Sequence, residues 1–240
     1  MAQSISGFGY LASGIRLLVQ PSIKRFVIMP ILINILVFSS MIYVSAQQFT
    51  LFMDWILPAD AWYSMIRPLL WPLFAIAAVL IGFFTFSMVA NMLASPFNNL
   101  LAQRVEEHLT GQKLSAKETE LSIMNSIRNE IRKILYALSR AIPILILFLI
   151  PGVNIAAPAI WFLFGAWMMT IQYADFTMAN HNLLFDEQRR RLKTKKIASL
   201  GFGTAVTLMT LTPILNFFAM PSAVAGATKM WVDVLRHVDP

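Results

Sequence analysis

Four long stretches of this chain contain no charged residue, and they constrain its fold more than any other feature. They are residues 26–53, 68–103, 141–174 and 197–228, and together they make up more than half of the 240 residues. A charge in the hydrocarbon of a bilayer costs several kcal/mol, so this segregation is typical of chains that lie largely in a membrane. One water-soluble core could not bury a chain that is 58% hydrophobic and 13% charged. We therefore predict an all-α integral membrane protein.

Two of the uncharged stretches have the length of spanning helices. A helix needs about 20 apolar residues to cross a bilayer, and residues 26–46 and 68–92 supply them. The stretches 141–174 and 197–228 are interrupted by prolines and are shorter than the roughly 40 residues that two crossings need. Each of these therefore crosses once as a broken helix, or enters the membrane and returns as a hairpin.

The distribution of lysine and arginine favours the second alternative, because cytoplasmic loops carry an excess of these residues. If both broken stretches are re-entrant hairpins, 18 of the 19 basic residues lie on one side of the membrane, whereas single crossings give only a weak bias. This topology places both termini, residues 104–140 and the basic run 189–196 in the cytoplasm, and residues 47–67 outside. We interpret the basic run as a determinant of orientation and a contact for lipid headgroups.

The N-terminal residues 1–20 do not resemble a cleaved signal peptide, because they have no basic leader and carry Arg16 within their apolar stretch. We expect them to be retained. Their apolar side chains recur at helical spacing, at Phe8, Leu11, Ile15, Leu18 and Val19. The pattern predicts an amphipathic helix within residues 1–25, which lies either along the membrane surface or against the rest of the protein.

The two proline-interrupted stretches share a motif, Leu-x-Pro-x-x-Asn followed by a second proline. It ends at Asn154 and Pro158 in the first stretch, and at Asn216 and Pro221 in the second. Paired, broken apolar segments often mark a transport pathway, because their unpaired backbone groups are tolerated only against protein or a watery cavity. We favour this interpretation over simple hairpin packing. Asn154 and Asn216 are expected to bind freed backbone groups at the hairpin tips.

Residues 95–140 are predicted to form cytoplasmic amphipathic helices. Ser95-Pro96 indicates a helix start, Thr110-Gly111 a stop, and the capping box Ser115-Ala116-Lys117-Glu118 a second start. The second helix carries an apolar stripe that we expect at the membrane surface, made of Ile123, Ile127, Ile131, Ile134 and Leu138. The charged residues form either a buried network at a pore mouth or a solvated surface, which we favour slightly: Arg104, Glu106, Glu107, Arg128, Glu130 and Arg132.

No enzyme signature is visible. The sequence lacks a Gly-x-Ser-x-Gly motif, a phosphate-binding glycine loop and a His-Glu-x-x-His motif, and the histidines at 108, 181 and 237 are scattered. We therefore expect no catalytic residue, no metal site, no cofactor and no ATP-driven pumping by this chain alone. Membrane sidedness explains the net charge of +7, so nucleic-acid binding is not expected.

The most informative polar cluster is Gln20-Pro21-Ser22-Ile23-Lys24-Arg25-Phe26, at the start of the first apolar stretch. Proline in the first helical turn leaves the N–H groups of Ser22, Ile23 and Lys24 without partners in the helix. Free N–H groups at a helix start attract anions, and the side chains of Ser22, Lys24 and Arg25 add donors suited to a tetrahedral oxyanion. From these residues alone, we prefer the alternative that Lys24 and Arg25 anchor to lipid phosphates.

Motifs along nearly the whole chain resemble the CysZ sulfate permease family of bacterial inner membranes. They include Gln20-Pro21-x-x-x-Arg25-Phe26, Ala94-x-Pro96-Phe97-Asn98, Ile150-Pro151-Gly152, Ile171-Gln172-Tyr173-x-Asp175 and the block from Pro213 to Asp233. The resemblance implies a multi-pass inner-membrane protein with two long transmembrane helices, two half-penetrating hairpins and a homo-oligomeric assembly. It also implies import of sulfate into the cytoplasm for cysteine synthesis.

The resemblance changes the preferred role of the basic cluster to sulfate binding by Ser22, Ile23, Lys24 and Arg25. Relatives often carry a glycine and two arginines in this loop, and a lysine cannot grip two sulfate oxygens as an arginine can. Relatives also often have an acidic residue at the position of Gln103. The predicted pathway therefore rests on Arg104, Arg128, Arg132, Asn154 and Asn216.

A membrane interaction or scaffold protein is the alternative class. In that case the same basic loops bind anionic lipid or a partner, and nothing is transported. Selective, saturable sulfate binding distinguishes the two classes, because a lipid-contact surface has no reason to prefer sulfate over phosphate. For the transporter we expect sulfate and membrane lipids as partners, and both a channel and a proton-coupled carrier fit these residues.

Overall fold

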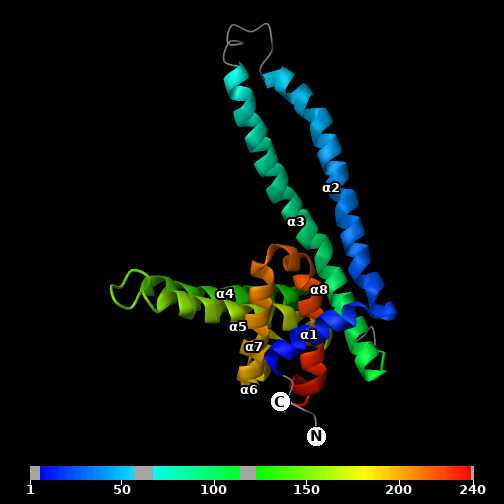
Figure 1. The fold of residues 1–240 in the computed structure, drawn as a ribbon, viewed down its shortest axis with the longest axis vertical. Helices are drawn as coiled ribbons and strands as arrows, with labels where there is room; N and C mark the ends of the chain where they lie inside the picture. The colour runs from blue at the N-terminus through cyan, green and yellow to red at the C-terminus, as the bar shows by residue number, and fades with distance from the viewer. Residues whose placement is uncertain (1–5, 57–66, 114–122, 239–240) are drawn as a thin grey trace. The chain divides into compact units, whose positions relative to one another are not determined.

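A computed structural model describes residues 6–56, 67–113 and 123–238, and these ranges are helical with no strand (Figure 1). This confirms the all-α prediction. In chain order the elements are α1 (Gly7–Leu18), α2 (Pro21–Ile56), α3 (Arg67–Thr110), α4 (Ile123–Leu147), α5 (Ala157–Asn180), α6 (Phe185–Thr194), α7 (Lys196–Leu211), α8 (Pro213–Met230) and a π-helical turn at Trp231–Leu235. They form two compact units, Met1–Val27 with Asn98–Pro240, and Ile28–Phe97.

The smaller unit, Ile28–Phe97, holds most of α2 and the N-terminal part of α3. Large apolar side chains are exposed along both helices, such as Leu36 and Val79. The stretches 26–46 and 68–92 are each helical throughout. Within the described ranges, no helix has both the length and the hydropathy that a membrane crossing requires.

The helix α3 continues where the sequence predicted a new start. It runs through Ser95 and Pro96 without a break, so the predicted start there is wrong. A proline inside a helix removes one hydrogen bond, and in a helix as long as α3 the hydrogen bonds on either side of the proline keep the helix intact. The predicted stop is confirmed, because α3 ends at Thr110 and Gly111 has a φ of 71°, which glycine adopts without strain. The capping box at 115–118 lies outside the described residues.

Helix α1 packs against α7 and α8 within the larger unit. Tyr10 is fully buried there, and Gly14 approaches α8 so closely that a Cβ would collide with the Ser222 carbonyl oxygen. The sequence left open whether this helix lies along the membrane surface or against the rest of the protein, and the structure shows it packed against the protein. Ile15 in α1 and Val19, directly after its last residue, nevertheless remain exposed, so apolar surface also faces outward here.

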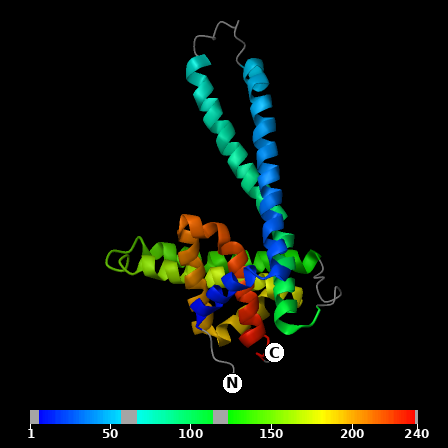
Figure 2. The ribbon, with the colours of Figure 1, turned by 45° about the vertical axis from the view of Figure 1, so that its right-hand side comes forward.

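Two helix pairs in the larger unit reverse the chain direction. Helices α4 and α5 lie side by side and are joined by the turn 148–156, and α7 and α8 are joined at Thr212 (Figures 1 and 2). Pro158 and Pro213 lie in the first turns of α5 and α8, where a missing N–H removes no helical hydrogen bond. The chain therefore reverses at two of the places where the sequence predicted a break.

Two other prolines do not break their helices. Pro143 lies inside α4 and Pro221 inside α8, so the prediction that they interrupt the apolar stretches is wrong. The first helix pair is also longer than the predicted hairpin 141–174, because α4 already begins at Ile123. Neighbouring helices supply the packing that keeps a proline-containing helix intact.

The core of the larger unit lies among α5, α7, α8 and the π-helical turn. Phe202 and Val224 are fully buried. Some polar groups inside are hydrogen-bonded, as the Thr170 hydroxyl donates to the Ser199 carbonyl oxygen at 2.6 Å, whereas the buried hydroxyl of Ser222 has no partner among the described residues. Gly203 faces the Ala166 carbonyl with no room for a Cβ, so α5 and α7 are in direct backbone contact.

The predicted apolar stripe on α4 faces outward. Ile127, Ile131, Ile134 and Leu138 are each about half exposed, while Lys133 on another face is buried. The side chain of Ile123 lies outside the described residues. The larger unit therefore does not cover the stripe, and its contact with a membrane surface stays a prediction.

Candidate functional site

The predicted anion site lies in the first turn of α2. The helix begins at Pro21, as the sequence indicated. The N–H groups of Ile23 and Lys24 both donate to the Gln20 carbonyl oxygen, with N–O distances of 3.0 and 2.9 Å. The prediction that these two N–H groups lack partners is therefore wrong, because the carbonyl preceding the helix accepts from both. These two N–H groups are therefore not available to an oxyanion, which leaves side chains as the main donors at this turn.

The four predicted binding residues differ in accessibility. Ser22, Lys24 and Arg25 are exposed, whereas Ile23 is fully buried. Ile23 therefore fixes this turn in the core and does not face a ligand. The hydroxyl of Ser22 and the cations of Lys24 and Arg25 are left as surface donors.

The ring of Phe26 brings two predicted cations together. The guanidinium carbon of Arg25 lies 5.0 Å from the ring centroid, and that of Arg104, from α3, lies 5.4 Å from the same centroid. Both distances are within the range of cation–π attraction. The sequence placed Arg25 in the binding set and Arg104 in the pathway, and the structure places both against one aromatic ring.

Arg104 keeps a hydrogen-bond donor without an acceptor. Its Nη1 donates to Oε2 of Glu107 at 2.7 Å. Its Nε is buried and has no hydrogen-bond partner in the described structure. Leaving a buried donor unpaired is unfavourable, so an acceptor that reached Nε would gain a strong, charge-assisted hydrogen bond.

His108 joins the same end of α3 to the start of α2. Its Nδ1 lies 3.4 Å from the hydroxyl oxygen of Ser22. The sequence analysis assigned no role to His108, because the three histidines are scattered along the chain. A signal was present, because Arg104 and His108 are four residues apart and therefore share one face of a helix.

We call Ser22, Lys24, Arg25, Arg104 and His108 the α2 entry site. Four of these side chains carry hydrogen-bond donors, and the imidazole of His108 donates from a ring nitrogen that bears a proton. Glu107 is the carboxylate that pairs with Arg104. Sulfate offers only hydrogen-bond acceptors, so a set of hydroxyl, ammonium and guanidinium groups matches it chemically. The arrangement can bind an oxyanion at a helix start.

The other predicted pathway residues have no contact with this site in the described structure. Arg132 on α4 pairs with Asp186 on α6, with an N–O distance of 2.5 Å, and Arg128 is exposed on the same helix. Asn154 and Asn216 are exposed where the helix pairs reverse. Among the described residues neither amide side chain makes a hydrogen bond, and their expected role in binding freed backbone groups is therefore not seen.

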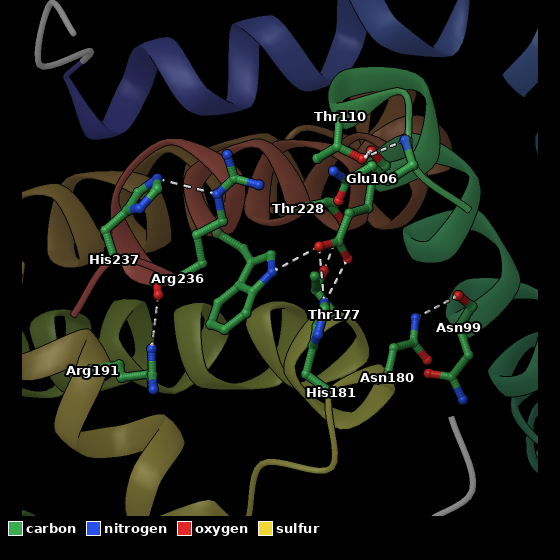
Figure 3. A network of polar contacts seen from close by, with 12 residues as sticks. Asn99, Glu106, Thr110, Thr177, Asn180, His181, Arg191, Thr228, Arg236 and His237 are labelled. Carbon is green, nitrogen blue, oxygen red and sulfur yellow. Dashed lines mark hydrogen bonds and ion pairs between the residues drawn. The ribbon is translucent and has the colours of Figure 1, made fainter. Parts of the chain in front are cut away.

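A buried polar network starts at Glu106, within the same segment of α3 (Figure 3). Both carboxylate oxygens lie 2.9 Å from Nε2 of His181, and Oε1 accepts a hydrogen bond from Nε1 of Trp231 at 3.0 Å. Glu106 is only 4% exposed. The solvated-surface interpretation is therefore wrong for Glu106. Its partners lie 75 and 125 residues away in sequence, which is why the sequence reading missed them.

Further hydrogen bonds join α5 to its neighbours around this network (Figure 3). The amide of Asn180 donates to the Asn99 carbonyl oxygen at 3.1 Å, and the hydroxyls of Thr177 and Thr228 are 2.7 Å apart. All of these side chains except that of Asn99 are buried. The network therefore ties the C-terminal part of α3 to α5 and α8.

The basic run 189–196 contains one structural arginine. Arg191 is buried, and its Nη1 donates to the Leu235 carbonyl oxygen at 3.0 Å while its Nε donates to Glu187 at 2.7 Å. Its guanidinium also lies 5.6 Å from the ring centroid of Trp231. The prediction of a headgroup-contacting run therefore does not apply to Arg191, because its donors already hold the C-terminal turn. The lysines of the run, at 193, 195 and 196, are exposed.

Lys133 on α4 is a buried cation that the sequence reading did not single out. Its Nζ lies 2.7 Å from Asp175 and 3.0 Å from Glu130. Burial lowers the pKa of Lys133, but the attraction of Asp175 and the hydrogen bonds to both carboxylates outweigh it, so that the pKa is raised overall. Lys133 therefore stays charged and holds α4 to α5.

Comparison with known proteins shows the family. Residues 10–221 match the family described as sulfate transporter CysZ/etoposide-induced protein 2.4. The chain belongs to this family. The sulfate transporter CysZ of Pseudomonas fluorescens (strain Pf0-1) is 42% identical over 236 residues, which cover 96% of this chain and 94% of the relative. The sulfate transporters CysZ of Pseudomonas aeruginosa (strain LESB58) and Pseudomonas paraeruginosa (strain DSM 24068 / PA7) are 40% identical over 234 residues, with 95% of each chain covered.

Membership of the CysZ family confirms the resemblance that the sequence motifs indicated. The family is one of transporters and not of enzymes, which agrees with the prediction that this chain is not an enzyme. A transporter acts in a membrane, so membership also implies a membrane location. The matched residues include the α2 entry site, Glu106 and His181, and end before Trp231.

Proposed function

We propose that this chain imports sulfate across the bacterial inner membrane into the cytoplasm, where sulfate feeds cysteine synthesis. The observation that carries the proposal is the 42% identity, over 96% of the chain, with a protein named sulfate transporter CysZ. The α2 entry site supports it chemically, because its donors match an anion that has only acceptors to offer.

Sulfate binds, in this proposal, to the side chains of Ser22, Lys24 and Arg25. Arg104 completes the site from α3, because it shares the Phe26 ring with Arg25 and retains an unpaired Nε donor. A guanidinium can hold two oxygens of one anion, whereas a lysine acts as a point charge. We therefore assign the directional contacts to the two arginines and the long-range attraction to Lys24.

Charge and exposure support the membrane arrangement in this proposal. We propose that the stretches 26–46 and 68–92 span the bilayer, and that the turns of the two helix pairs enter it and return. Large apolar side chains are exposed at both reversals, with Leu149 at 81% and Ile155 at 84% exposed in the first turn, and Ile214 at 77% exposed at the start of α8. Such a concentration of exposed apolar groups favours burial in lipid. The same topology places 18 of the 19 basic residues in the cytoplasm.

The pathway in this proposal continues from the α2 entry site along polar residues of the helix pairs. Two spanning helices in one chain do not enclose a pore, so we propose that a homo-oligomer supplies the remaining walls. The residues that we propose to line the pathway are Arg104, Arg128, Arg132, Asn154 and Asn216.

The test is radiolabelled sulfate uptake by liposomes that contain only this chain, with excess unlabelled phosphate present. We expect uptake above that of empty liposomes, and we expect phosphate not to suppress it. Absence of uptake by vesicles that contain folded protein contradicts transport by this chain alone. It favours the interaction-protein alternative, in which the basic loops bind lipid or a partner.

The location of the binding site has its own test. We expect Lys24→Ala with Arg25→Ala to weaken sulfate binding by about tenfold or more, because a hydrogen bond to a charged group contributes about 1.5–3 kcal/mol. The matched control is Arg16→Ala with Lys113→Ala, which removes two exposed cations elsewhere and should leave sulfate affinity within about twofold. Equal affinities of the two double variants place the site elsewhere.

A further inference from the structure

A cavity lies between the α4–α5 pair and the junction of α6 with α7. Its volume is about 750 Å³, which is within the range of small-molecule sites. Its lining combines three cations, Arg140, Lys193 and Lys196, with a mainly apolar wall that includes Ile144 and Leu163. We call it the hairpin groove. None of its residues belongs to the α2 entry site.

The charged residues that line the groove are all positive. Its three cations come from three different helices, and no carboxylate lines it. The nearest acids along α6 are engaged elsewhere, as Asp186 pairs with Arg132 and Glu187 pairs with Arg191. Among the described residues, none of the three cations forms an ion pair. The groove therefore presents uncompensated positive charge to a ligand.

The groove also changes from charged to apolar along its length. Trp167 donates from Nε1 to the hydroxyl of Tyr136 at 3.0 Å, which fixes the register of α5 against α4. From that level, Arg140 and then Ile144 lie along α4 towards the turn 148–156. On α5, Leu163 lies between this turn and Trp167. Lys193 and Lys196 therefore lie at the end near α6 and α7, Arg140 lies about level with Leu163, and Ile144 and Ile160 lie closer to the hairpin turn.

The apolar end is accessible. Ile160 and Leu163 line the groove and are 38% and 52% exposed, and the exposed side chains of Leu149 and Ile155 continue the apolar surface in the turn. A free inorganic anion would use the cations and leave this wall in contact with water. A ligand with an anionic head and a hydrocarbon tail satisfies both parts at once.

We propose that the hairpin groove binds an anionic phospholipid. The phosphate lies at Arg140, Lys193 and Lys196, and an acyl chain follows Ile144, Ile160 and Leu163 towards the hairpin turn. A zwitterionic lipid is disfavoured, because its ammonium group would face the same three cations. The inference rests on the proposed function only in requiring that the chain lies in a membrane, and it is independent of sulfate.

The experiment measures lipid binding to the full chain in detergent by native mass spectrometry. The probes are phosphatidylglycerol, phosphatidylcholine and glycerol 3-phosphate, which carries the phosphate without the tail. We expect phosphatidylglycerol to bind at least about tenfold more tightly than phosphatidylcholine, and glycerol 3-phosphate not to displace it at equal concentration. Displacement by glycerol 3-phosphate would mean that the site is one for a free phosphate, and equal binding of the two lipids would mean that it does not select charge. Either result overturns the proposal.

Two triple variants locate the site. Arg140→Gln, Lys193→Gln and Lys196→Gln together should reduce binding of phosphatidylglycerol about tenfold or more. The control combines Arg16→Gln, Lys113→Gln and Lys195→Gln, which removes the same charge from exposed positions outside the groove, one of them adjacent to Lys196. An equal loss in both variants, or none in the first, overturns the proposal.

Leu163→Gln tests the apolar wall separately, at an exposed position where misfolding is not expected. It should weaken phosphatidylglycerol binding while the charge preference remains, and unchanged affinity overturns the assignment of the acyl chain. Sulfate uptake is recorded on the same preparations. Intact uptake without lipid preference overturns only the lipid site, and lipid preference without uptake overturns only the transport proposal.

Discussion

Both carboxylate oxygens of Glu106 lie 2.9 Å from Nε2 of His181, and this pair joins α3 to the end of α5. The carboxylate is almost completely buried, while the imidazole is about a quarter exposed. A buried carboxylate is tolerated only when its oxygens accept hydrogen bonds, and Trp231 supplies a further donor. The three residues therefore act as one structural unit.

Removal of this carboxylate should destabilise the larger unit. Glu106→Ala leaves the buried N–H of Trp231 and the ring nitrogen of His181 without their acceptor, so we expect the free energy of unfolding to fall by about 2–4 kcal/mol. Glu106→Gln retains an acceptor oxygen and should cost less. Chemical unfolding in detergent measures both variants. The exposed Gln112→Ala is the control, and an unfolding midpoint of Glu106→Ala equal to that of Gln112→Ala contradicts the assignment.

The Phe26 ring should matter for sulfate affinity without touching the anion. Phe26→Leu keeps an apolar side chain but removes the face on which Arg25 and Arg104 rest. Since a cation–π contact contributes about 0.5–2 kcal/mol, we expect sulfate to bind roughly twofold to thirtyfold more weakly. Phe26→Tyr retains the ring and should bind normally. Calorimetric titration with sulfate measures the affinity of both variants. Equal affinities of the Leu and Tyr variants would show that the ring does not position Arg25 and Arg104 for sulfate.

Acid should weaken the contact of α6 with the C-terminal turn through Glu187. The hydrogen bond from Arg190, together with that from Arg191, outweighs partial burial and holds the pKa of Glu187 below its ordinary value of about 4.5. The stabilisation is thus fully present above that value and is lost as the pH falls through the lower, folded-state pKa. We expect Glu187→Gln to flatten the pH dependence of unfolding between about pH 5 and pH 3. Parallel profiles for wild type and variant would show that Glu187 does not contribute.

Two glycine substitutions should have opposite effects. Gly14→Ala places a Cβ against the Ser222 carbonyl oxygen and should separate α1 from α8, with a loss of about 1–3 kcal/mol. Gly165→Ala is the matched control, because no atom lies within 4 Å of a Cβ at that position in α5. Alanine there should leave stability unchanged or raise it by up to about 1 kcal/mol, since alanine favours a helix. Thermal unfolding of both variants tests the packing of α1, and equal midpoints contradict it.

Local signals in the sequence predicted local structure well. Pro21 starts α2, Thr110 and Gly111 end α3, and Pro213 starts α8, because proline and glycine act on their own backbone and need no distant partner. The same reasoning was wrong at Pro96, which lies inside α3. A proline at a helix start and a proline within a helix look alike in sequence, and the surrounding packing decides between them.

The candidate site was predictable in part. Ser22, Lys24 and Arg25 are exposed at a helix start, as their order in the chain indicated. The N–H groups of Ile23 and Lys24 are committed to the Gln20 carbonyl, and the meeting of Arg25 with Arg104 depends on how α3 packs against the start of α2. A spacing pattern within one helix carries no information about such a contact.

The sequence by itself determined the all-helical class, the segregation of charge from more than half of the chain, and membership of the CysZ family. These conclusions follow from composition, periodicity and motifs, which are properties of the residue order and do not depend on the fold. Only the tertiary structure decided which polar residues are buried and with whom they pair. Glu106 with His181, Lys133 with Asp175 and Arg191 with the Leu235 carbonyl are contacts between distant segments. Burial and pairing arise only when the helices pack, so the same charged residue types that indicate a solvated surface in the sequence form the polar interior of the folded chain.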